Sequence, residues 1–182
     1  MRDRVDLFVI SLLVLFLELA CIRWFPAHVP FLTFFTNVVL LACFLGMSTG
    51  CLAARRPQHY LRWTPLVLIV ALAAAHWVHF VRQRSGSFVD VGNQISPQLV
   101  FFGTEYGAGD PSVFVVPIEA VTGLLFILIA LALVGPGQQL GRSLSRISNP
   151  IEAYTVNIAG SLAGVATFTA CSWWQLTGRR RS

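Results

Sequence analysis

The chain has 182 residues, of which 55% are hydrophobic and only 12% are charged, and its mean hydropathy is +0.70. Soluble domains carry about twice this share of charged residues, so the composition predicts an integral-membrane protein rather than a soluble one. All 13 basic residues are arginines, and they lie between or beside apolar runs. The net charge of +5 is therefore interpreted as membrane-flanking charge, and no nucleic-acid partner is expected.

Five apolar segments are each long enough to cross a hydrocarbon core, which takes about 20 helical residues. They span approximately residues 5–25, 31–54, 63–81, 112–134 and 151–176. We predict a single all-α domain over residues 1–182, a polytopic membrane protein with about five transmembrane helices in a compact bundle. Residues 82–111 form the one long polar loop, and Gly135-Pro136-Gly137 is expected to end the fourth helix.

The first apolar segment has one alternative interpretation, a cleaved signal peptide, because Arg2 and Arg4 precede its apolar core. Glu18 within that core, and the lack of a small-x-small cleavage site, favour a retained helix. The arginines divide into seven on the side of the N-terminus and six on the other side. This bias favours a multi-pass protein of the cell inner (plasma) membrane with a cytoplasmic N-terminus.

Four polar side chains fall within the predicted spans, namely Glu18, Asn37, Glu119 and Asn157. A charge at mid-membrane costs about 2.5–3.5 kcal/mol, so Glu18 is expected to face protein or water. It is either a proton or ligand site, or a carboxyl that is protonated or paired with Arg23 or Asn37. Glu119 lies nearer to the start of its helix, where the helix dipole favours a hydrated carboxylate. The two amides are expected to hold helices together.

Two stretches have small residues four apart, Gly46 to Gly50 and Gly160 to Gly164. Small residues let helix backbones approach closely in a membrane, so we expect all four glycines at helix-packing positions. The two small faces are candidates to contact each other. The cysteines form no CxxC motif and are interpreted as small packing residues; they are Cys21, Cys43, Cys51 and Cys171.

His76 and His79 share a helical face and are the candidate ligands for a transition metal, a haem or a chlorophyll-type pigment. The alternative is an interfacial belt with Trp77, while His28 and His59 are assigned to loops. No further ligand stands at a matching depth, so no metal site and no cofactor are predicted, although bound lipid is expected. The sequence also lacks the GxSxG, HExxH, P-loop and GxGxxG motifs of enzymes.

Several stretches together resemble the N-terminal membrane region of membrane-bound spermidine-synthase-like proteins: Leu15–Trp24, Phe35–Leu41, Phe44–Gly50, Gly137–Arg142 and Ala153–Gly164. In that family a soluble Rossmann-like aminopropyltransferase domain follows further membrane helices. This sequence reaches Ser182 without such a domain, so the resemblance implies a helical membrane module and no transferase activity.

Two functions of different classes follow from these features. The first is a non-catalytic accessory or structural subunit that packs against other integral-membrane subunits, in a complex of the respiratory or photosynthetic type. The second is a small transporter or ligand-binding membrane domain for a cation or polyamine, in which Glu18, Asn37, Glu119 and Asn157 converge on one cavity. A membrane enzyme is a third class, for which the sequence offers no motif.

Overall fold

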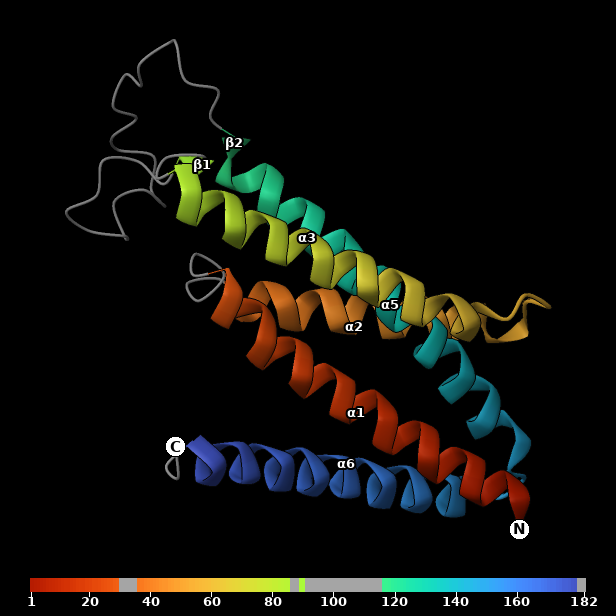
Figure 1. Cartoon of the computed structure of the whole chain (residues 1–182). Helices are drawn as coiled ribbons and strands as arrows, with labels where there is room; N and C mark the ends of the chain where they lie inside the picture. Colours follow the sequence, from red (N-terminus) through yellow and green to blue (C-terminus); the bar gives the residue numbers. More distant parts are fainter. Residues whose placement is uncertain (30–35, 86–88, 91–115, 180–182) are drawn as a thin grey trace.

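The computed structural model describes residues 1–29, 36–85, 89–90 and 116–179, with side chains described within 1–29, 37–80 and 120–174. Five long helices make up most of this part of the chain and confirm the all-α membrane bundle (Figure 1). They are α1 (Arg2–His28), α2 (Thr36–Leu52), α3 (Thr64–Ser85), α5 (Ile118–Arg146) and α6 (Pro150–Arg179).

The connections are short, apart from the one between α3 and α5. Two 3-10 helices, η2 (Ala53–Arg55) and η3 (Tyr60–Trp63), join α2 to α3. Between α3 and α5, β1 (Val89–Asp90) pairs in parallel with β2 (Val116–Pro117). The remainder of the predicted loop 82–111 beyond α3 and β1 lies outside the described residues.

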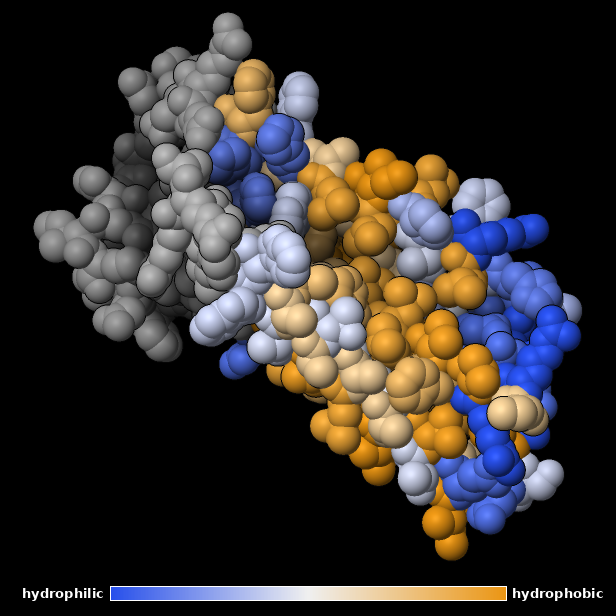
Figure 2. Space-filling model, turned by 60° about the horizontal axis from the view of Figure 1, so that its bottom comes forward, coloured by the Kyte–Doolittle hydropathy of each residue, from blue (hydrophilic) through white to orange (hydrophobic). Residues whose placement is uncertain are grey.

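Four helical segments are long and apolar enough to cross a membrane, at residues 2–28, 37–55, 60–80 and 120–146. Their outward side chains are large and apolar, as with Ile69 and Ile127, because lipid rather than water covers such a surface. Figure 2 shows a broad hydrophobic band on one face, with hydrophilic residues gathered beside it at one end. The fifth helix, α6, has 30 residues, but its described part is less apolar than these four segments.

The central helix is α5, which packs against α1, α2 and α3 and touches the start of α6. Leu125, Ile129 and Leu133 of this helix are almost completely buried. The prediction that Gly135-Pro136-Gly137 ends this helix is wrong, because α5 continues through Pro136 to Arg146. Close packing against α2 and the α2–α3 connection holds the continuation in place, and membrane helices tolerate such prolines where neighbouring protein satisfies the backbone.

Each predicted glycine lies against the backbone of a neighbouring helix, but the two small faces do not contact each other. A Cβ built at Gly50 would lie 2.7 Å from the backbone nitrogen of Gln138 in α5, and Gly46 lies equally close to α5. Gly160 and Gly164 lie instead against α1, where a Cβ at Gly164 would lie 2.7 Å from the carbonyl oxygen of Leu12. The expected contact between the two faces is therefore corrected: α2 pairs with α5, and α6 pairs with α1.

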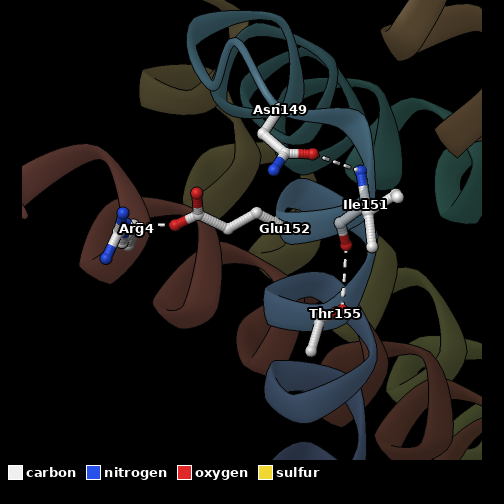
Figure 3. Close-up of polar contacts among 5 residues, drawn as sticks. All are labelled: Arg4, Asn149, Ile151, Glu152 and Thr155. Carbon is white, nitrogen blue, oxygen red and sulfur yellow. Dashed lines mark hydrogen bonds and ion pairs between the residues drawn. The ribbon is translucent and has the colours of Figure 1, made fainter.

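The start of α6 is tied to the start of α1 (Figure 3). The Oδ1 atom of Asn149 accepts a hydrogen bond from the Ile151 N–H at 3.1 Å, as an N-terminal helix cap does. Glu152, in the first turn of α6, forms an ion pair with Arg4 of α1. The hydroxyl of Thr155 donates to the Ile151 carbonyl oxygen at 2.9 Å, so it is satisfied within its own helix.

The close contact between α2 and α5 predicts a large penalty for a single methyl group at Gly50. In Gly50→Ala the new Cβ would meet α5 backbone, which has no rotamer to relieve the overlap, so the variant should lose about 1–3 kcal/mol of stability. Gly123→Ala in α5 is the matched control, because nothing lies within 4 Å of a Cβ there. Unfolding of both variants in detergent micelles measures the difference, and equal stabilities would contradict the close α2–α5 contact.

Candidate functional site

The four intramembrane polar residues predicted to share a cavity lie in different places. Glu18 is buried on α1, and Asn157 faces α1 from α6. Asn37 is exposed in the first turn of α2. Glu119 lies in the first turn of α5, and its side chain is outside the described residues. The three described side chains therefore do not form one polar cavity.

Glu18 is the most buried acidic residue of the described chain, with 5% of its surface exposed. Neither predicted partner reaches it, because Asn37 is exposed and Arg23 donates to the hydroxyl of Ser172 in α6. Two buried thiols belong to the adjoining core, Cys21 about one turn further along α1 and Cys43 of α2. Glu18 therefore lies on the buried stripe of α1, together with Val14 and Cys21.

Asn157 links α6 to α1 through a serine that the sequence reasoning did not single out. The Ser11 hydroxyl lies 2.8 Å from Asn157 Oδ1 and 2.7 Å from the carbonyl oxygen of Leu7. A hydroxyl has only one hydrogen to donate, and the Ser11 hydroxyl donates it to the Leu7 carbonyl oxygen. If the Asn157 amide is turned so that Nδ2 faces Ser11, Nδ2 donates to the hydroxyl oxygen and both contacts are satisfied. Ser11 also borders Gly160, where the two backbones approach. This amide is a packing contact between helices, as expected for Asn157.

The best-formed polar cluster of the described chain centres on Gln138, a residue that the sequence reasoning did not select as a site. Its side chain is 1% exposed, and Nε2 donates to the carbonyl oxygen of Ala53 at 2.9 Å. Its Oε1 accepts a hydrogen bond from the backbone N–H of Tyr60 at 3.0 Å. Gln138 thus gives the Tyr60 N–H a partner and adds a second hydrogen bond to the Ala53 carbonyl oxygen, which also accepts one from the Arg56 N–H.

Arg142, one turn further along α5, completes this cluster. Its Nε atom donates to the carbonyl oxygen of Ala54 at 3.0 Å. One terminal NH2 group donates to two further carbonyl oxygens, those of Gln58, at 2.9 Å, and of Arg56. The other terminal nitrogen lies 2.8 Å from Nδ1 of His59. A guanidinium at the C-terminal end of a helix is also favoured by the helix dipole. We call Gln138, Arg142 and the carbonyls they bind the α5 anchor.

A signal for the α5 anchor was present in the sequence. Gly137 and Gly141 are four residues apart, as are Gln138 and Arg142, so each pair forms one stripe along a helix. A Cβ at Gly137 would lie 2.6 Å from the carbonyl oxygen of Met47, which shows how closely α2 and α5 approach. The pattern was missed because Pro136 was interpreted as the end of the helix.

Three histidines gather where α1 and α3 end. His28 is the last residue of α1 rather than a loop residue, and its ring stacks on Trp24 with 3.9 Å between centroids. Nδ1 of His79 lies 3.0 Å from the carbonyl oxygen of His28, and the ring of His76 lies 6.5 Å from that of His79. Among the side chains that the structure describes, no three His, Cys, Asp or Glu are arranged to hold a metal ion.

The α5 anchor predicts that Gln138 stabilises the fold far more than the adjacent glutamine. Gln138→Leu should cost about 1–3 kcal/mol, because the partly buried Tyr60 N–H loses its partner and the Ala53 carbonyl oxygen keeps only its bond from the Arg56 N–H. Gln139→Leu is the matched control, since Gln139 is only half-buried. Thermal unfolding in detergent compares them, and equal losses would show that Gln138 does not hold the α2–α3 connection.

Comparison of the chain with known proteins identifies no relative. No protein-family model, curated protein or solved structure matches the chain. The membrane bundle, the two glycine contacts and the α5 anchor are therefore the observations on which a function is proposed.

Proposed function

We propose that this protein is a non-catalytic integral-membrane accessory subunit, which packs into a larger membrane complex. The observation that carries the proposal is the position and composition of α6. This helix packs along α1, and its first turn contacts the end of α5. It has 30 residues, but no stretch of membrane-spanning length in its described part is as apolar as those of the four clear membrane spans. A helix of this kind is stabilised in a membrane when protein, rather than lipid, covers more of its surface.

The exposed surface of α6 includes a second stripe of small residues. Thr155, Ala159, Ala166 and Ala170 recur at near-helical spacing around Leu162 on the same face, and all five are exposed. They lie apart from Gly160 and Gly164, which α1 covers. Because small residues mark close helix–helix contacts in membranes, the stripe is the surface at which we place a partner helix.

The described intramembrane polar groups support a structural role over transport. Ser11 and Asn157 join two helices, and Gln138 binds backbone groups of a helix end and a loop. Asn37 is separate and exposed. A carrier for a cation or polyamine needs several such groups to face one cavity, and the described side chains do not converge in that way.

We further propose the cell inner membrane as the location, with the N-terminus in the cytoplasm. Seven arginines support this orientation, because they lie at the end of the bundle that holds the N-terminus (Figure 1): Arg2, Arg4, Arg55, Arg56, Arg62, Arg142 and Arg146. The resemblance to the membrane region of spermidine-synthase-like proteins stays a prediction.

The proposal is tested by purification of the tagged full chain from its native membrane in mild detergent. We expect it to migrate with a stable set of other membrane subunits. Replacing both Ala159 and Ala166 by Leu should release the chain from that set without lowering its own thermal stability, because both alanines are exposed. Gly160 and Gly164 are unsuitable for this test, since larger residues there would displace α6 from α1.

The control for this pair is Ala73→Leu, an exposed alanine on α3. It should leave the chain in the complex. The proposal fails if the wild-type chain purifies alone and binds a cationic solute such as spermidine. Loss of that binding in Glu18→Gln, with an unchanged fold, would establish the ligand-binding alternative.

A further inference from the structure

A groove opens between α2, α3 and α5 at the end of the bundle that holds the N-terminus. Its volume is about 550 Å³, which suits part of a lipid molecule rather than a single ion. The walls are mainly apolar and include Leu52, Val67, Leu131 and Val134. Leu52 is 85% exposed and Leu131 is 52% exposed, so the groove is open along the lipid-facing surface.

The mouth of the groove has the chemistry of the headgroup region. Arg56, Tyr60 and Trp63 line it, and the guanidinium of Arg62 lies 5.8 Å from the centre of the Trp63 ring. Aromatic residues with an apolar body and a polar tip gather at membrane–water interfaces. An amphiphile with its head at Arg56 and its tail along Leu131 would match both parts of the groove.

In the part of the chain that the structure describes, no carboxylate pairs with the positive charge at this mouth. The sequence contains no Asp or Glu between Glu18 and Asp90. At this end of the bundle, Glu152 pairs with Arg4, and Asp6 lies 4.0 Å from Arg146. Within the described residues, no ion pair involves Arg56 or Arg62.

The backbone beneath these arginines is held in place before any ligand arrives. Arg142 of the α5 anchor donates hydrogen bonds to the carbonyl oxygens of Arg56 and Gln58. Gln138 fixes the N–H of Tyr60, on the other side of the same short connection. A mouth ordered in this way loses less conformational entropy when it binds a headgroup.

A second groove, of about 460 Å³ between α1 and α6, makes a useful comparison. It also has an arginine, Arg23, but that guanidinium already donates to the hydroxyl of Ser172. The groove beside Arg56 is therefore the better candidate for an anionic head.

We propose that the α2–α3–α5 groove is a binding site for an anionic phospholipid. The phosphate sits at the guanidinium groups of Arg56 and Arg62, and one acyl chain lies along Leu52 and Leu131. Arginines close to a membrane surface attract anionic lipids, and basic pockets between membrane helices bind their headgroups. The apolar walls select a membrane lipid over a free phosphate.

The test uses the full chain purified in detergent and titrated with micelles of phosphatidylglycerol or phosphatidylcholine that have the same acyl chains. Native mass spectrometry measures the retained lipid. Phosphatidylglycerol should be retained in preference, and Arg56→Gln should weaken its binding about fivefold. Arg2→Gln is the control, because it removes an exposed charge at the same end of the bundle but outside the groove.

A second variant tests the acyl-chain contact. Leu131→Trp places a larger side chain in the groove and should reduce binding of phosphatidylglycerol, with circular dichroism reporting that the fold is kept. Equal retention of the two lipids would overturn the proposal. An equal loss of binding in Arg2→Gln and Arg56→Gln would also overturn it, because general surface charge would then explain the binding. So would displacement of bound phosphatidylglycerol by glycerol phosphate at the same concentration as by added phosphatidylglycerol.

Discussion

The contact on which the rest of the bundle depends is the close approach of α2 and α5. Lipid tails are as apolar as leucine, so burial of apolar side chains alone does not drive helices together in a membrane. Close packing of the helix backbones therefore contributes more to helix association than it does in water. Gly46 and Gly50 on α2, with Gly137 and Gly141 on α5, allow that approach. It keeps α5 helical beyond Pro136 and so carries Gln138 and Arg142 to the end of α2, where they bind backbone carbonyls.

The second glycine contact is independent of the first. Gly160 and Gly164 bring α6 to α1, and the Ser11–Asn157 contact and the Arg4–Glu152 ion pair act on the same two helices. The bundle is thus a core of four helices with α6 fastened along one of them. That arrangement leaves much of α6 exposed, which is why this helix carries the proposed surface for a partner subunit.

Polar residues inside the membrane and polar residues near its surface have different roles in this bundle. Inside the membrane, Glu18 is buried in the bundle, and Asn157 lies at the contact between α6 and α1. Near the surface, the α5 anchor orders the basic connection that contains Arg56, and this places positive charge over an apolar groove. Accessory packing and lipid binding are compatible, since each uses a different face of the bundle.

The sequence by itself determined the class of fold and the approximate order of the helices, because long apolar runs have few solutions other than membrane helices. It also identified the glycine faces and the packing role of Asn157. Only the tertiary structure decided which faces meet, because a small-xxx-small pattern permits close approach without specifying a partner. The same holds for Pro136, where contacts with α2 override a local signal for a helix end, and for Glu18, which is buried although Arg23 bonds to Ser172 and Asn37 is exposed. Local sequence patterns define the helices and their faces. Which helices pack together depends on how well the surfaces of segments far apart in the sequence fit each other.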